Sequence, residues 1–492
     1  MLPIMEKHFN KFRKNVVGID QTFQSPYGVK QIIYADWIAS GRLYRPIEDK
    51  IIETFGPFVG NTHTETSETG TLMTKAYHLA QKKIKEHVNA GPNDVIITAG
   101  SGMTTVINKF QRILGFRAMS KMDKLDCLPE QERPVVFITH MEHHSNHTSW
   151  LETIADVVQL KPNKELLVDL DELRNELEKH KDRKMKIGSF TACSNVTGIS
   201  TPYHQMARIM HENGGLCFVD FAASAPYVDM NMHPEDPLQA LDAIFYSPHK
   251  FLGGPGTPGV LIFNSAIYQN SVPDNSGGGT VDWTNPWGEF KYVDDIEVRE
   301  DGGTPGFLQT IKAALCIDLK NKMGVENMHQ REKELVKIAF EEMLKIPGLH
   351  ILADNVQDRL GIISFYLDDV HFNLACKLLN DKFGIQVRGG CACAGTYGHF
   401  LLDVSHDKSK QITDLINHGD LSRKPGWVRL SIHPTMTTDE LYFTIDAIKQ
   451  VQLNHQTWGK DYLYLNKINE FRHINEPEDK TSLVCDWFKL SE

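Results

Sequence analysis

Apolar positions recur along the middle of the chain with two alternating periods. In TLMTKAYHLAQKKIKEHVNA (71–90) they have the spacing of one helix face, and Gly91-Pro92 separates this segment from DVIITAG (94–100), an apolar run that predicts a strand. The same alternation continues with predicted strands at 134–140, 186–194, 215–223, 242–247 and 259–263, and with helices from about 145 and at 203–214. This order predicts a mostly parallel sheet with helices on both faces.

The pattern changes from about residue 310, where long amphipathic helices such as 331–346 predominate. A strand-like run at 361–367 and a last helix near 437–453 follow, and together they predict a second, smaller α+β domain. We therefore expect, in chain order, an N-terminal segment that packs with the small domain (1–34), a large α/β domain (35–310), the small domain (311–453) and a C-terminal extension (454–492).

Composition and charge narrow the classes of function. The chain has 492 residues, 41% of them hydrophobic, which is enough for a large core, and no run approaches the roughly 18 apolar residues of a membrane span. The formal net charge is −11 without a block of lysine and arginine, which argues against a nucleic-acid partner and favours a small-molecule substrate. No signal peptide is visible, so we expect a cytoplasmic location and no membrane. The eight cysteines are too sparse for a disulfide scaffold, and only Cys391 and Cys393 lie close together.

One charged residue lies between two predicted buried strands. Lys250, in FYSPHKFLGGPGTPGVLIF (245–263), follows one strand and precedes the next, and the glycines after it allow a ligand to approach the backbone. An amine in a partly desolvated pocket has a lowered pKa and acts as a nucleophile or forms a Schiff base. A solvated side chain is the ordinary alternative for a lysine, but this position favours Schiff-base chemistry.

Three other segments begin where a predicted strand ends, which is where ligands bind in α/β sheets. In AGSGMTTVINKF (99–110), Thr104 opens a helix whose free N–H groups suit a phosphate, although a glycine turn with a threonine cap fits equally well. In MEHHSNH (141–147) the histidine spacing matches no standard zinc site, so we expect no metal and a stacking role for one histidine. In FVDFAASAPY (218–227), Asp220 either caps a turn or stays ionised against a cation such as a protonated ring nitrogen.

Seven short motifs follow one another in an order typical of one enzyme family: MEHHSN, ACSNVTG, VDFAA, SPHK, DGGTPG, VRGGCAC and VRLS. By this order and spacing the chain resembles the fold-type I, class V family of pyridoxal-phosphate (PLP) enzymes, and within it the group II cysteine desulfurases and selenocysteine lyases. The resemblance extends from about Tyr34 to about residue 450. It implies a large domain around a mostly parallel, seven-stranded sheet, PLP as the cofactor, and an amino acid, L-cysteine first, as the substrate.

The resemblance assigns cofactor contacts to residues that follow the predicted strands. Lys250 would form the Schiff base, Asp220 would keep the ring nitrogen of PLP protonated, and His143 would stack on the ring. Asn195 would lie by the phenolic oxygen of the cofactor. The phosphate would be held by Thr104, Ser247 and His249 with the backbone N–H groups of Gly102 and Met103.

The same resemblance implies residues for the substrate and for a second subunit. Arg429 in VRLS would bind the substrate carboxylate as a planar bidentate donor, with Arg388 and Asn195 as further substrate contacts. Thr304 in DGGTPG resembles a residue that reaches the phosphate of the neighbouring subunit, which implies a homodimer.

Cys393 is the candidate for handling sulfur. It lies five positions after Arg388, as the nucleophilic cysteine does in the desulfurase motif, and the loop RGGCACAGTYGH is rich enough in glycine to expose a thiol. The implied mechanism has Lys250 removing the α-proton of the amino acid, after which the Cys393 thiolate attacks the substrate sulfur. Alanine leaves, and the persulfide on the enzyme passes to an acceptor protein. A non-reactive thiol, or a metal pair formed with Cys391, are the alternatives for Cys393.

Two positions depart from the family pattern. Ala223 stands where many desulfurases have a glutamine, so one hydrogen bond to the phenolic oxygen is absent, and the segment 394–428 is longer than in the family and is placed to cover the pocket mouth. The alternative functions are a class V aminotransferase, epimerase or selenocysteine/cysteine lyase that uses Lys250 without Cys393, and a catalytically silent sulfur carrier or regulatory partner. The joint presence of Lys250, Asp220, His143 and Arg429 weighs against the silent protein.

Overall fold

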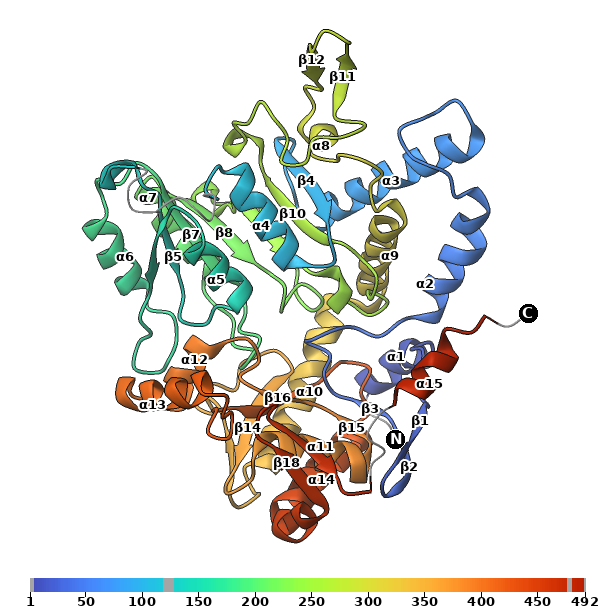
Figure 1. Cartoon of the computed structure of the whole chain (residues 1–492), viewed down its shortest axis with the longest axis vertical. Coiled ribbons are helices and arrows are strands. Elements are labelled where there is room, and N and C mark those ends of the chain that lie inside the picture. Colours follow the sequence, from blue (N-terminus) through green and yellow to red (C-terminus); the bar gives the residue numbers. More distant parts are fainter. Residues whose placement is uncertain (1–3, 118–127, 476–479, 491–492) are drawn as a thin grey trace.

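A seven-stranded sheet lies at the centre of the larger part of the molecule (Figure 1). The computed structural model describes residues 4–117, 128–475 and 480–490. In spatial order the strands are β4 (Asp94–Ala99), β10 (Gly259–Asn264), β9 (Ala243–Tyr246), β8 (Leu216–Asp220), β7 (Lys186–Thr191), β5 (Val135–Ile138) and β6 (Asp156–Gln159). Within this sheet β10 is antiparallel to both of its neighbours and the other pairs are parallel, so the predicted mostly parallel sheet is confirmed.

Both faces of this sheet are apolar. On β8, Val219 packs into the core on one face and Phe218 into the core on the other, and neither side chain is exposed. Strands buried on both faces require near-continuous apolar runs, which is the pattern seen along the sequence. One face is covered by α4 (Met103–Ile113) and α5 (His144–Leu151), and the other by α3 (Glu68–His87), α6 (Leu170–Lys179), α7 (Tyr203–Glu212) and α9 (Phe307–Met323).

The smaller domain is built on a four-stranded antiparallel sheet. Its strands, in spatial order, are β13 (Leu349–Ile351), β14 (Ile362–Leu367), β17 (Trp427–Ser431) and β16 (Arg388–Gly390). A second apolar core joins this sheet to α10 (Val325–Met343), α11 (Phe372–Phe383) and α14 (Thr438–Trp458). The predicted helix at 331–346, strand at 361–367 and last helix at 437–453 correspond to α10, β14 and α14. The division into domains at residue 310 stays a prediction, and α9, which spans that position, packs into the core of the large sheet.

The N-terminal segment contacts both domains. In α1 (Ile4–Arg13), Phe9 packs into the large core, while Arg13 pairs with Glu440 of α14 at 2.7 Å. A hairpin of β1 (Thr22–Ser25) and β2 (Gly28–Gln31) follows, and then β3 (Ile33–Tyr34), which pairs in parallel with β15 (Ile385–Gln386), and α2 (Arg45–Lys50). Between β3 and α2, the Gly41 N–H donates to the carbonyl of His249 at 2.9 Å. This contact brings the segment after β3 against the loop that carries Lys250.

Four further pieces lie outside the two sheets. The long segment after Cys393 forms α12 (Gly395–Leu401) and α13 (His406–Asn417), and the C-terminal extension forms the hairpin of β18 (Tyr462–Leu465) and β19 (Glu470–His473) and then α15 (Thr481–Trp487). The hairpin of β11 (Val281–Thr284) and β12 (Phe290–Tyr292) projects from the large domain ahead of α8 (Ile296–Arg299) (Figure 1). Among the helices of the described residues, none has both the length and the apolar character that crossing a membrane requires.

The first testable prediction concerns a buried ion pair that ties α1 to the small domain. The Arg331 side chain is 1% exposed and its guanidinium donates to Glu6 at 3.0 Å, and Glu6 also accepts from Thr438. Arg331→Ala leaves the Glu6 carboxylate buried without its cation, so the free energy of unfolding should fall by about 3–5 kcal/mol. Denaturant unfolding followed by circular dichroism measures this loss.

Lys337→Ala on the same helix is the matched control. Lys337 pairs with Glu341 at the surface, where both side chains are more than half exposed, so its loss should change the free energy of unfolding by less than about 0.5 kcal/mol. Equal, small effects of the two substitutions would contradict a stabilising role for the buried pair.

Candidate active site

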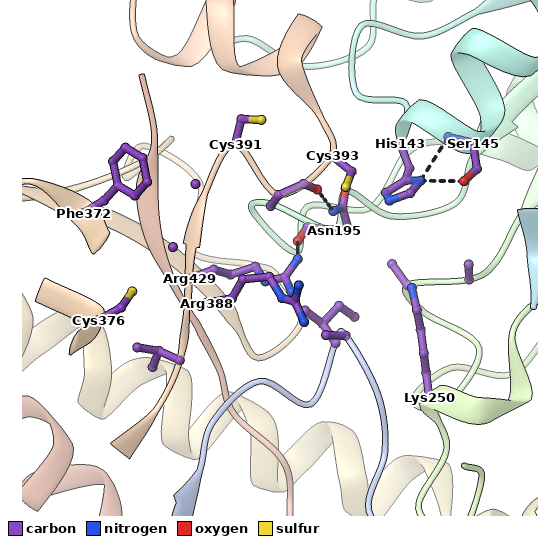
Figure 2. Close-up of a pocket in the computed structure, with 18 of the residues that line it drawn as sticks. His143, Ser145, Asn195, Lys250, Phe372, Cys376, Arg388, Cys391, Cys393 and Arg429 are labelled. Atoms are coloured by element: carbon purple, nitrogen blue, oxygen red, sulfur yellow. Dashed lines mark hydrogen bonds between the residues drawn. The ribbon is translucent and has the colours of Figure 1, made fainter. Parts of the chain in front are cut away.

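The carboxyl ends of β4, β5, β7, β8 and β9 open onto one pocket between the two domains. Figure 2 shows side chains that line this pocket. The pocket has a volume of about 980 Å³. The ends of these strands and the segments that follow them contribute, in chain order, Thr104, His143, Asn195, Asp220 and Lys250. Residues predicted from five separate segments thus meet at one place, because parallel strands present their carboxyl ends at the same edge of a sheet.

Lys250 enters the pocket from the loop between β9 and β10 (Figure 2). The residue is half-buried, and its ammonium group makes no hydrogen bond or ion pair with the described residues. Burial lowers the pKa of Lys250 to about 8, with Asp220 acting against this shift and Arg429 adding to it. A usable fraction of neutral amine is therefore present near neutral pH, as a nucleophile or base requires.

Asp220 ends β8 and is 3% exposed. Its Oδ1 accepts a hydrogen bond from the Ala222 N–H at 2.8 Å, so the carboxylate does cap the following turn. Burial raises the pKa of Asp220 to about 6, while the Ala222 hydrogen bond and Lys250 act in the opposite direction. The carboxylate is still mostly ionised at neutral pH, which suits a partner for a cationic ring nitrogen.

The N-terminus of α4 faces the pocket among hydroxyl groups. The Met103 N–H donates to Ser247 Oγ at 2.8 Å, and Thr104 Oγ1 lies 2.6 Å from Ser145 Oγ. A Cβ at Gly102 would lie 3.2 Å from Ser247 Oγ, so the absence of a side chain keeps this backbone open. The first N–H groups of an eleven-residue helix together with these hydroxyls form a site suited to a phosphate.

Two histidines of the pocket are neutral at physiological pH. His143 caps α5, where its Nδ1 accepts from the Ser145 N–H at 3.1 Å. Burial, with the nearby charge of Lys250, lowers the pKa of His143 to about 3, and burial lowers the pKa of His249 to about 4. The imidazole ring of His143 is uncharged and partly exposed, so it is suited to stacking on an aromatic ligand.

A carboxylate that the sequence analysis did not single out joins the two arginines. Asp36 Oδ1 accepts from Arg429 Nη2 at 2.9 Å, and Asp36 Oδ2 accepts from Arg388 Nε at 3.0 Å. Arg429 is 4% exposed, and its Nε is buried without a hydrogen-bond partner among the described residues. The guanidinium therefore retains donor capacity for a ligand carboxylate. Asp36 directly follows the apolar run IIYA, which is the same signal that identified Asp220.

Cys391 and Cys393 lie on a tight turn that forms one wall of the pocket (Figure 2). Cys393 is exposed, whereas Cys391 is half-buried against an apolar cluster beneath α12. Burial lowers the pKa values of Lys250 and Arg429 and is the largest effect on both. The negative charge of a Cys393 thiolate acts in the opposite direction and raises both pKa values. Cys393 thus lies within electrostatic reach of the lysine and of the buried arginine.

Asn195 and Ala223 belong to the inner wall of the pocket. Asn195 Nδ2 donates to the Ala392 carbonyl at 2.7 Å, and Asn195 Oδ1 is buried without a partner among the described residues. Ala223 is 5% exposed and offers no side-chain hydrogen bond. Thr304, by contrast, lies in an exposed loop ahead of α9 and does not line this pocket, so its contact with a neighbouring subunit stays a prediction.

The C-terminal extension and α11, which have no predicted role, form the outer wall of the pocket together with the segment 394–428, which the sequence predicts at the pocket mouth. The turn of the β18–β19 hairpin and the start of β19 (residues 468–471) line the pocket, as does Cys376 on α11. The long segment before β17 contributes Leu421 and Lys424. The aromatic and charged mixture of the C-terminal extension is typical of surface segments and carries no local sign of this placement.

Comparison with known proteins assigns the family. Residues 33–442, most of the chain, match the family Aminotransferase class-V. The chain belongs to the class-V aminotransferase family. It is therefore a PLP-dependent enzyme, as the resemblance implied.

Curated relatives and solved structures agree with this assignment. A probable cysteine desulfurase of Staphylococcus epidermidis is 29% identical over 372 residues, which are 74% of this chain and 84% of the relative. One of Halalkalibacterium halodurans is 27% identical over 371 residues, again 74% and 84% of the two chains. The apo structure of a cysteine desulfurase from Thermococcus onnurineus NA1 has a TM-score of 0.71 at 18% identity and covers 92% of this chain and 99% of its own. A cysteine desulfurase of Escherichia coli has a TM-score of 0.68 at 20% identity, with 90% and 98% covered. The predicted fold class is confirmed.

The groups of the pocket fit the cofactor of this class-V family. Lys250 supplies an amine of lowered pKa, and Asp220 supplies an ionised, buried carboxylate. Both line the same pocket as a helix N-terminus that is suited to a phosphate. The missing side chain at Gly102 leaves that N-terminus accessible, and Asn195 Oδ1 is a buried polar atom that still lacks a partner.

The second prediction concerns the pH dependence of cofactor capture. Since only the neutral amine of Lys250 attacks an aldehyde, and its pKa is lowered to about 8, the rate of covalent PLP capture by cofactor-free protein should rise with pH and level off just above 8. Visible absorbance after mixing the two at pH values between about 6 and about 10 measures this rate. Lys250→Ala should capture no PLP covalently. A rate that is still rising near pH 10, as for a solvated lysine, would contradict the buried amine.

Proposed function

We propose that this enzyme is a cysteine desulfurase, which removes sulfur from L-cysteine to give alanine and a persulfide on Cys393. The observation that carries the proposal is the exposed thiol of Cys393 on the same pocket as Lys250 and Arg429. The cysteine desulfurase names of the relatives support it.

The other cysteines of the pocket strengthen the choice of Cys393. Cys193 and Cys376 also line the pocket, but burial raises the pKa of Cys376 to about 12 and raises that of Cys193 further, so both remain protonated thiols. Cys391 is half-buried in an apolar cluster. Cys393 is the exposed cysteine among the described residues that line the pocket.

The cofactor contacts are part of the proposal. PLP, when bound, supplies an aldehyde for covalent attachment and a ring that accepts electrons from the substrate. We assign attachment to Lys250, the proton at the ring nitrogen to Asp220, and stacking to the neutral ring of His143. The phosphate cradle would consist of Thr104, Ser247 and His249 with the backbone N–H groups of Gly102 and Met103, and Asn195 would lie by the phenolic oxygen with Ala223 contributing no hydrogen bond.

Substrate binding and proton removal follow from the charged groups of the pocket. The buried guanidinium of Arg429 binds the substrate carboxylate, assisted by Arg388 and Asn195, with Asp36 fixing the orientation of both arginines. The Lys250 amine then accepts the α-proton at Nζ, which its lowered pKa allows near neutral pH.

The sulfur step uses the Cys393 thiolate as nucleophile. Its Sγ forms a bond to the substrate sulfur while the bond between that sulfur and the substrate Cβ breaks, and the electron pair stays with the carbon. That carbon takes up one proton and the α-carbon regains the proton held at Lys250 Nζ, which completes alanine, and Cys393 retains the sulfur as a persulfide. The balance is one thiolate, one cysteine and one proton in, and one persulfide and one alanine out.

We also propose that the enzyme works as a cytoplasmic homodimer that passes sulfur to an acceptor protein. The exposed position of Thr304 away from its own pocket supports a contact with the neighbouring site. The seven described cysteines are all free thiols, which supports a reducing compartment.

The third prediction separates Cys393 from Cys391. Cys393→Ser should still bind L-cysteine, because Lys250 and Arg429 are unchanged, yet its alanine release should fall on the order of a hundredfold or more, because a hydroxyl is a poor nucleophile toward sulfur. Alanine is measured by chromatography. Mass spectrometry of wild-type protein after brief exposure to L-cysteine should show one added sulfur on the peptide with residues 389–395.

Cys391→Ser is the matched control on the same turn and should release alanine at close to the wild-type rate. Full alanine release by Cys393→Ser, or a persulfide found on Cys391 alone, would favour a lyase or aminotransferase in which the turn is structural. Absence of turnover with every amino acid would favour the silent carrier.

The fourth prediction concerns Asp220. Asp220→Ala should keep bound cofactor but slow the exchange of the substrate α-hydrogen with deuterated water by roughly a hundredfold, the scale of a lost acid–base partner, because an unprotonated ring accepts electrons poorly. Proton magnetic resonance of the substrate measures the exchange. A near wild-type rate would contradict the assignment.

A further inference from the structure

The turn that carries Cys393 has an unusual backbone conformation. Ala392 has φ 50° and Cys393 has φ 55°, and the Ala394 N–H donates to the Cys391 carbonyl at 3.0 Å. Positive φ at both central residues is the mark of a type I′ turn, which normally contains glycine or asparagine. Side chains with a Cβ are strained in this region, and such strain persists only where surrounding contacts enforce it.

The contacts that enforce this turn come from the large domain. The His144 N–H donates to the Cys393 carbonyl at 2.8 Å, and the Gly395 N–H donates to His144 Nε2 at 3.0 Å. On the other side, Asn195 Nδ2 donates to the Ala392 carbonyl at 2.7 Å. His144 therefore binds the chain at two points directly after the Cys393 side chain, the Cys393 carbonyl through its backbone and the Gly395 N–H through its ring.

The ring contact requires a neutral imidazole. Nε2 accepts a hydrogen bond from a backbone N–H, so the ring proton lies on Nδ1. Burial lowers the pKa of His144, and the charge of Lys424 across the pocket mouth acts in the same direction. The neighbouring imidazoles of His143 and His147 also have lowered pKa values, so no cationic histidine disturbs this acceptor at neutral pH.

We propose that His144 is a positioning residue for the sulfur step: its ring holds the strained 391–395 turn against the large domain and so aims the Cys393 thiol at the substrate. His143, the preceding residue, faces the ligand side of the same pocket. Two consecutive histidines at the start of α5 thus link the ligand-facing wall to the cysteine turn of the other domain. The inference rests on the proposed desulfurase function and adds a residue to it.

The fifth prediction tests the anchor with paired substitutions in the cofactor-bound enzyme. His144→Ala removes the acceptor of the Gly395 N–H, so hydrogen–deuterium exchange of the peptide spanning residues 391–397 should accelerate at least about tenfold. His144→Gln supplies an amide oxygen at a similar distance and should keep the exchange near wild type. His147→Ala, one turn along α5 and with only a 3.5 Å contact to Thr396, is the matched control and should leave the exchange unchanged. Unchanged exchange in the peptide containing β8 verifies that each variant is folded.

The kinetic readout separates positioning from binding. With L-cysteine, His144→Ala should lower kcat for alanine release about tenfold or more and leave KM nearly unchanged, and His144→Gln should restore kcat. Exchange in His144→Ala equal to wild type, or His144→Gln as defective as His144→Ala, would overturn the anchor. If wild-type enzyme forms no persulfide on Cys393 while the exchange pattern is as expected, the turn anchor stands and the desulfurase proposal fails.

Discussion

The strands of the large sheet are apolar on both faces, and this constraint decides where the polar groups of the site lie. β8 and β9 have no polar face, so Asp220 lies at the end of β8 and Lys250 lies after the end of β9. Because the two strands are parallel, their carboxyl ends lie at the same edge of the sheet. At that edge the covering helices leave charges poorly hydrated. The same burial raises the pKa of Asp220 and lowers that of Lys250, so an acid and a base move toward neutral pH together.

The opposite wall of the site depends on a charge balance between distant parts of the chain. Arg388 and Arg429 come from adjacent strands of the small domain, and Asp36, which follows β3, bridges them. Removing that carboxylate would leave a guanidinium that is 4% exposed without its anion. Asp36 thus orients the arginine that is proposed to bind the substrate carboxylate, and Arg429 Nε has no hydrogen-bond partner among the described residues.

How far the sequence alone leads can be judged from particular residues. Doubly buried strands and amphipathic helices are set by local periodicity, so β8, β9 and α14 were predictable, and so were polar residues at strand ends such as Asp220. The Asp36 bridge was not predicted because it pairs residues more than 350 positions apart, and no local pattern encodes such a partner. The place of Ile468–Phe471 in the pocket wall likewise depends on how the last hairpin packs on α11, which is a matter of tertiary contact alone.

The location of Cys393, the proposed nucleophile, on the small domain has a physical reason. Cys193 lines the same pocket from the sheet side, but the packing that builds the sheet edge also buries it, and burial raises the pKa of its thiol. Any cysteine at that edge would meet the same low-dielectric surroundings and stay protonated. A thiol that is to react as a thiolate must lie in solvent and yet stay close to the lysine, and a turn reaching across from the other domain satisfies both conditions. The cost is a backbone with positive φ at Ala392 and Cys393, which hydrogen bonds from the large domain hold in place.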